Sequence, residues 1–138
     1  MTARYLADKS ALSRISHPEV ASWLEARLLE GDVARCSIID LEVLFSARSH
    51  RDLIEIRDER TAGFPLVETT QADFERAQSV MEALARTGKH RAVGIPDLLI
   101  AAVAERAGLV VVHYDADFDL IAGVTKQPMH WVVPKGRV

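Results

Sequence analysis

Four acidic residues of this 138-residue chain stand beside apolar segments, where an unpaired carboxylate is costly to bury. Two like charges ~4 Å apart repel by about 4 kcal/mol at an effective dielectric near 20. A fold that gathers four carboxylates would therefore need a compensating cation. Hard oxygen ligands favour Mg²⁺ or Mn²⁺ over zinc, and two such ions can activate water for phosphodiester hydrolysis. The four residues are Asp8, Glu42, Asp97 and Asp115.

Glu42 is the most informative of the four. Its helical spacing places it on one stripe with apolar residues, which predicts that it points toward the core. A core-facing glutamate is rarely buried unpaired, so an ion pair with Arg48 or Arg51 is the structural alternative to a metal site. The apolar residues of the stripe are Ile38, Leu41 and Phe45.

The three aspartates could instead cap helices. Asp97 opens an apolar helix, and aspartate is a favoured N-cap residue. Asp8 could cap the first helix, helped by Ser10. Asp115 begins an acidic cluster with Asp117 and Asp119 that would also suit the start of a helix. Capping explains each residue singly, but it does not explain why all of them should converge on one sheet edge.

The elements that must position these acids are short β-like runs alternating with helical stretches. This alternation predicts βαβ units in a single three-layer α/β/α domain spanning residues 1–138, with a mostly parallel sheet. Such sheets bind ligands beyond the carboxyl ends of their strands, where Asp8 and Asp115 should lie. The predicted strands are residues 3–7, 33–37, 66–68, 109–112 and 131–133.

Apolar residues at helical spacing predict the helices. Ser16 and Glu19 form a capping-box signature for the second helix, and Thr70 should cap a later one that turns Phe74 inward. Trp23 and Trp131 are interpreted as core residues. Arginines within 48–60 should pair with acidic residues one helical turn away. The predicted helices are residues 10–15, 19–30, 38–47, 51–60, 70–88, 98–104 and 118–122.

Composition is that of an ordinary folded protein, with 49% hydrophobic and 27% charged residues and a net charge of −3. Cys36 is the single cysteine, so neither a disulfide framework nor a cysteine zinc site is expected. The chain has no N-terminal apolar segment and no apolar run approaching ~18 residues. We therefore expect a cytoplasmic protein with no membrane association.

Four segments of the chain resemble the ordered acidic motifs of PIN-domain ribonucleases, most closely those of the short VapC-type toxins of bacterial type II toxin–antitoxin pairs. The segments are YLADKSAL (5–12), SIIDLE (37–42), IPDLLIAA (95–102) and HYDADF (113–118). The resemblance implies a PIN-like fold in which Asp8, Glu42, Asp97 and Asp115 hold one or two Mg²⁺ or Mn²⁺ ions. It also implies that Asp117 is an auxiliary ligand and that Ser10 hydrogen-bonds near the metal.

Basic residues near these motifs are candidates for RNA contact. Lys9 departs from the family, which usually has a small hydroxyl residue at this position; it could contact an RNA phosphate or compete with metal for the carboxylates. Residues 86–91 form a basic stretch that includes Lys89 and Arg91. Positive charge beside an acidic site would help to capture a polyanion, although a solvated loop is the simpler interpretation.

The expected function is that of a metal-dependent endoribonuclease toxin that cleaves structured RNA, such as transfer or ribosomal RNA, to inhibit translation and growth. The resemblance also implies a small cognate antitoxin and a homodimer. One alternative is a catalytically silent PIN-like module that binds RNA or protein. A phosphatase of the haloacid dehalogenase type would need Asp-x-Asp after the first strand, where this chain has Asp8-Lys9-Ser10. A receiver domain would need paired acids there, a phosphoacceptor and a late lysine, a set that the sequence lacks.

Overall fold

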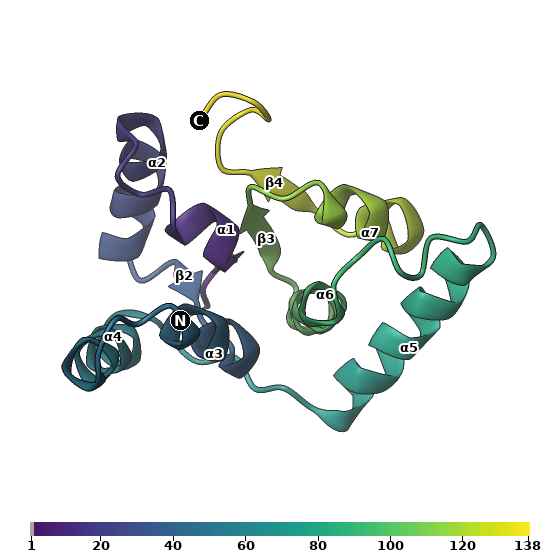
Figure 1. The fold of residues 1–138 in the computed structure, drawn as a ribbon, viewed down its shortest axis with the longest axis horizontal. Helices are drawn as coiled ribbons and strands as arrows, with labels where there is room; N and C mark the ends of the chain where they lie inside the picture. Colours follow the sequence, from purple (N-terminus) through teal and green to yellow (C-terminus); the bar gives the residue numbers. More distant parts are fainter. Residues whose placement is uncertain (1) are drawn as a thin grey trace.

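A computed structural model describes residues 2–138 and shows a four-stranded sheet in the order β2-β1-β3-β4 (Figure 1). β1 pairs with β2 and with β3, β3 pairs with β4, and every pairing is parallel. The predicted parallel sheet is therefore confirmed. The strands are β1 (Tyr5–Ala7), β2 (Val33–Ala34), β3 (Val110–His113) and β4 (Met129–Trp131).

Helices connect the strands and cover both faces of the sheet. Successive residues of a strand point to opposite faces, and Leu6 and Ala7 of β1 accordingly enter different apolar cores. The smaller core lies under α1 and α2, and the larger one under α3, α5, α6 and α7. This is the predicted three-layer arrangement. The helices are α1 (Lys9–Leu12), α2 (Pro18–Leu29), α3 (Ser37–Phe45), α4 (His50–Gly63), α5 (Gln71–Ala85), α6 (Ile95–Ala107) and α7 (Asp117–Thr125).

Helix α6 lies at the centre of the larger core. All seven residues from Leu98 to Ala104 are buried, as their apolar character predicts. The helix ends at Gly108, whose φ of 71° is left-handed and favours glycine. A buried helix of this kind holds the residues of its first turn in a fixed position.

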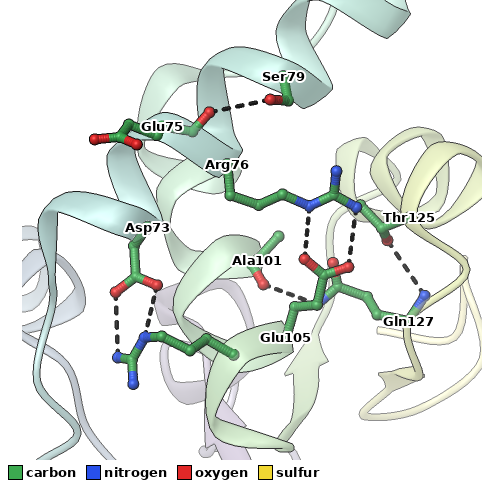
Figure 2. A network of polar contacts seen from close by, with 9 residues as sticks. Asp73, Glu75, Arg76, Ser79, Ala101, Glu105, Thr125 and Gln127 are labelled. Atoms are coloured by element: carbon green, nitrogen blue, oxygen red, sulfur yellow. Dashed lines mark hydrogen bonds and ion pairs between the residues drawn. The ribbon is translucent and has the colours of Figure 1, made fainter.

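Two ion pairs fasten α5 to α6. Asp73 accepts from Arg106 Nε at 2.8 Å, and Arg76 Nε lies 2.7 Å from Glu105 (Figure 2). Asp73 also completes a capping box with Thr70, so the predicted cap is confirmed. The expectation that Phe74 points inward is wrong, because its side chain is 48% exposed and Asp73 takes the buried position.

Other local predictions were wrong at element ends. Helix α2 begins after His17 with no side-chain cap, because Pro18 occupies its first turn, so the Ser16 capping box does not form. The strand expected at 66–68 is reduced to one bridge between Arg35 and Leu66. The last strand ends at Trp131 and does not extend to Val133.

The arginines of α4 pair in two ways. Arg51 and Glu55 form the predicted pair one turn apart. Arg60, however, is buried and reaches Asp40 of α3 at 2.7 Å, where Arg35 also binds. Within residues 2–138, no helix combines the length and the apolar character needed to cross a membrane.

Candidate functional site

A cleft of about 350 Å³ lies at the carboxyl ends of β1 and β3. β1 leads directly into Asp8, and β3 leads to Asp115, while α3 supplies Glu42 and the first turn of α6 supplies Asp97. The structure thus brings the four acids onto one surface, as the topology of a parallel sheet predicts. The cleft is lined by Asp8, Lys9, Ser10, Ser13, Glu42, Gly94, Pro96, Asp97 and Asp115.

Asp8 is the most deeply buried of these acids, with 4% exposure. It caps α1, because its Oδ2 accepts from Ser10 N at 3.0 Å and from Ser10 Oγ at 2.6 Å. Ser10 Oγ in turn accepts from the backbone N of Tyr114 at 2.9 Å, which links the ends of β1 and β3. Burial raises the pKa of Asp8 and the charge of Asp115 adds to this, while the Ser10 hydrogen bonds oppose it.

Asp97 is not the cap of α6, since Gly94 holds that position. Its carboxylate joins those of Asp115 and Asp117 in a group whose nearest oxygens all lie within 4.8 Å of one another. Burial, followed by the charges of Asp8 and Asp115, raises the pKa of Asp97 to about 8. The ionised form of Asp97 is therefore strongly disfavoured by burial and by the neighbouring negative charges.

Glu42 faces the cleft and not the core. The apolar stripe on which it was placed is largely exposed, with Leu41 at 63% and Phe45 at 91%, so the core-facing prediction was wrong. Arg51 pairs with Glu55, and the alternative of an ion pair from Arg48 or Arg51 to Glu42 is not formed.

Glu42 is partly buried, and one oxygen of its carboxylate has no hydrogen-bond donor within residues 2–138. Its Oε1 is buried with no hydrogen-bond partner among the described residues. Burial and the charge of Asp8 raise the pKa of Glu42, while Lys9 lowers it. A buried acceptor left without a donor is costly unless a ligand satisfies it.

A buried histidine that the sequence interpretation treated as structural supports Asp115. His113 is fully buried, and its Nδ1 accepts from the backbone N of Asp115 at 3.2 Å. Asp115 Oδ1 then accepts from the backbone N of Asp117 at 2.9 Å. Burial lowers the pKa of His113 to about 4, so the ring is neutral. The position of His113 at the end of the β-branched run, two residues before Asp115, is the sequence signal of this role.

The three basic candidates lie in different places. Lys9 lines the cleft and also a smaller neighbouring hollow of about 230 Å³ beside Glu42. Lys89 and Arg91 are exposed on the loop before α6 and do not line the cleft.

The donor set fits a hard divalent cation. All the acidic residues of the cleft offer oxygen atoms, and one oxygen of Glu42 is buried without a hydrogen-bond partner among the described residues. A nearby positive charge would lower the raised pKa of Asp97. Mg²⁺ and Mn²⁺ prefer such ligands.

The chain was compared with known proteins. The family described as "PIN domain" matches residues 5–124. Ribonuclease VapC21 of Mycobacterium tuberculosis is 48% identical over 136 residues, which cover 99% of each chain. Ribonuclease VapC51 of the same species is 46% identical over 138 residues, covering 100% of this chain and 99% of the relative.

Solved structures show the same fold. A DNA-bound VapBC from Salmonella typhimurium has a TM-score of 0.77 at 17% identity and covers 96% of this chain and 100% of its own. FitAcB from Neisseria gonorrhoeae has a TM-score of 0.73 at 18% identity, covering 93% and 97%. From the family match and the near full-length identity to VapC ribonucleases, this chain belongs to the PIN domain family and to its VapC group.

Proposed function

We propose that this protein is a metal-dependent endoribonuclease and the toxin of a toxin–antitoxin pair. One observation carries the proposal: Asp8, Glu42, Asp97 and Asp115 line a single cleft, in which burial and mutual repulsion raise the pKa of Asp97 to about 8. Crowded carboxylates of this kind either keep a proton or are stabilised in their ionised form by a cation between them. The relatives named as ribonucleases support the same activity.

Asp8, Glu42, Asp97 and Asp115 would hold one or two Mg²⁺ or Mn²⁺ ions, with Asp117 as an auxiliary ligand. The bound metal supplies an activated water and stabilises the charge that develops on the phosphate. Ser10 keeps the carboxylate of Asp8 in place through its two hydrogen bonds.

Three basic residues would bind the RNA. Lys9 stands at the rim of the cleft beside Glu42, within reach of a phosphate. Lys89 and Arg91 would contact the RNA backbone from the loop before α6, and they add affinity without base specificity.

The substrate we propose is structured RNA, either transfer or ribosomal RNA, whose cleavage stops translation and growth in the cytoplasm. A small cognate antitoxin would silence the enzyme, and the toxin would form a homodimer. The similarity to structures of VapBC and FitAcB supports an antitoxin partner.

Cleavage of total cellular RNA by the purified protein tests the proposal. We expect discrete fragments with Mg²⁺ or Mn²⁺, none with chelator, and none with Asp97→Asn. Asp58→Asn, an exposed acid of α4 outside the cleft, is the matched control and should cleave normally. A folded, metal-bound and antitoxin-free protein that cuts nothing would instead be a silent binding module.

A further inference from the structure

Lys9 and Glu42 line both hollows at the acidic end of the sheet, the cleft of about 350 Å³ and the smaller hollow of about 230 Å³. Lys9 is the first residue of α1, Glu42 belongs to α3, and both side chains are partly buried. Among residues 2–138, Lys9 is the one cationic residue in either lining. Its positive charge is therefore built into the Glu42 side of the acidic cleft.

The acids of the cleft are not evenly spaced. Asp97, Asp115 and Asp117 offer oxygens that all lie within 4.8 Å of one another. In the described part of the chain this is the one group of three acids so close together, and it includes neither Asp8 nor Glu42. One divalent ion can thus be held at the α6–α7 end of the cleft, while Glu42 lies apart from that group.

The charges that act on each end of the cleft agree with this division. The charge of Asp117 raises the pKa of Asp97, whereas the pKa of Glu42 is raised by Asp8 and lowered by Lys9. Lys9 forms no direct ion pair with any carboxylate that the structure describes. Its ammonium therefore acts on Glu42 through space.

A divalent ion placed beside Glu42 would be repelled by this ammonium. A divalent and a monovalent cation ~6 Å apart repel enough to weaken binding roughly 10-fold, even at the dielectric constant of water. The negative charge of Glu42 is already offset in part by Lys9, so Glu42 attracts a second ion less strongly than an uncompensated carboxylate would.

We propose that the acidic cleft holds a single divalent ion, bound by Asp97, Asp115 and Asp117, and that the ammonium of Lys9 takes the place of a second ion beside Glu42. The proposal rests on the metal-dependent function proposed above and fixes its metal count. An ammonium in this place can also donate to a phosphate oxygen of bound RNA, so it adds positive charge where a second metal would otherwise supply it.

Counting bound Mn²⁺ tests the proposal. Electron paramagnetic resonance is suitable because Mn²⁺ loses its free-ion signal when it binds, and the titration is done without RNA, so that the readout does not depend on cleavage. We expect one ion per chain in the wild type and in Lys9→Arg, which keeps the charge. In Lys9→Met, a second ion should bind at least roughly 10-fold more tightly than any second ion of the wild type.

Three further variants locate the ions. Lys135→Met removes an exposed lysine that lines neither hollow, and it should leave the count and the affinity unchanged. Glu42→Gln should weaken the first ion far less than Asp97→Asn does. Lys9→Met combined with Glu42→Gln should lose the second ion, because the two residues are coupled at one place. Circular dichroism checks that each variant is folded.

Several outcomes would overturn the proposal. Two ions of similar affinity in the wild type would do so, and so would identical binding curves for the wild type and Lys9→Met. A second ion that persists in the double variant would lie away from Glu42. No bound Mn²⁺ in the wild type would overturn the metal site itself. RNA cleavage is measured separately, so the nuclease function can stand when the wild type holds two ions.

Discussion

At the scale of single residues, Asp97 lowers the free energy of unfolding of the metal-free protein. Its pKa is raised to about 8, so the folded state holds a proton that the unfolded chain releases near pH 4. The free energy of unfolding therefore falls as the pH rises from about 4 toward 8. A bound cation would remove this penalty.

Asp97→Asn should stabilise the metal-free protein at pH 7.5 by about 1–2 kcal/mol, because asparagine is neutral in both states and need not take up a proton on folding. Urea unfolding in chelator at pH 5 and 7.5 measures this, and the gain should shrink at pH 5. Adding Mg²⁺ should stabilise the wild type more than the variant. Equal stability of the two proteins at both pH values would contradict a shared, repelling acidic site.

The contribution of His113 to stability depends on pH in the opposite sense, because it is lost as the pH falls. Its folded pKa of about 4 lies below the ordinary value of 6.5, because burial disfavours the charged ring. Its contribution is complete above pH 6.5 and is lost as the pH falls toward 4, with a slope of at most about 1.4 kcal/mol per pH unit.

His113→Gln should therefore flatten the loss of stability between pH 6.5 and 4.5, whatever its stability at pH 7. The exposed His17→Gln is the matched control and should leave the pH dependence unchanged. Urea midpoints across this range provide the measurement. A wild-type slope retained in His113→Gln would show that another group titrates.

At the scale of elements, α5 is attached to α6 by apolar packing and by two ion pairs of unequal burial. Asp73 has 2% side-chain exposure, and removing Arg106 would leave its buried carboxylate with the Thr70 backbone hydrogen bond but without a charged partner. Although burial alone would raise the pKa of Asp73, Arg106 and Thr70 hold it below the usual value. The Arg76–Glu105 pair is more exposed, with 40% and 29% side-chain exposure, and water can replace it.

Arg106→Met should cost about 2–3 kcal/mol of unfolding free energy, because a buried carboxylate is left unpaired. Arg76→Met should cost no more than about 1 kcal/mol, and the exposed Arg51→Met of α4 less still. Chemical denaturation of the three variants gives the ranking. Equal losses for Arg106→Met and Arg76→Met would mean that burial does not set the strength of these pairs.

The sequence predicts those elements whose pattern is local. The strand predicted at 109–112 lies within one residue of β3, and the helix predicted at 98–104 lies within α6. Both were recognised because their apolar residues are consecutive and buried, although α6 extends beyond this segment at both ends. Glu42 was placed in the wrong environment because periodicity identifies an apolar face but not whether that face is covered. The burial of Arg60 against Asp40, 20 residues away, depends on tertiary packing that no local pattern encodes.

At the scale of the whole molecule, the net charge of −3 does not show that acidic and basic residues are concentrated in different places. The acids that should hold metal place their negative charge in one cleft. Lys89 and Arg91 are instead exposed on the loop that leads into α6. RNA affinity would then depend on local charge and on ionic strength, and not on the overall balance.

Lys89→Ala and Arg91→Ala should each weaken RNA binding and reduce the slope of log affinity against log salt by roughly 0.7–0.9. Filter binding with the Asp97→Asn protein at several salt concentrations measures the slope. Arg51→Ala, at 90% side-chain exposure on α4, is the control. Slopes that match the parent protein would identify the 86–91 loop as merely solvated.

The Ser10 hydroxyl that joins Asp8 to the backbone of Tyr114 spans 104 positions of sequence. During synthesis, β1 therefore cannot pair with β3 until most of the chain has left the ribosome. At about 5–20 residues per second, that delay is roughly 5–20 s. The acidic cleft cannot be complete during this interval, because Asp97 and Asp115 have not yet been added to the chain.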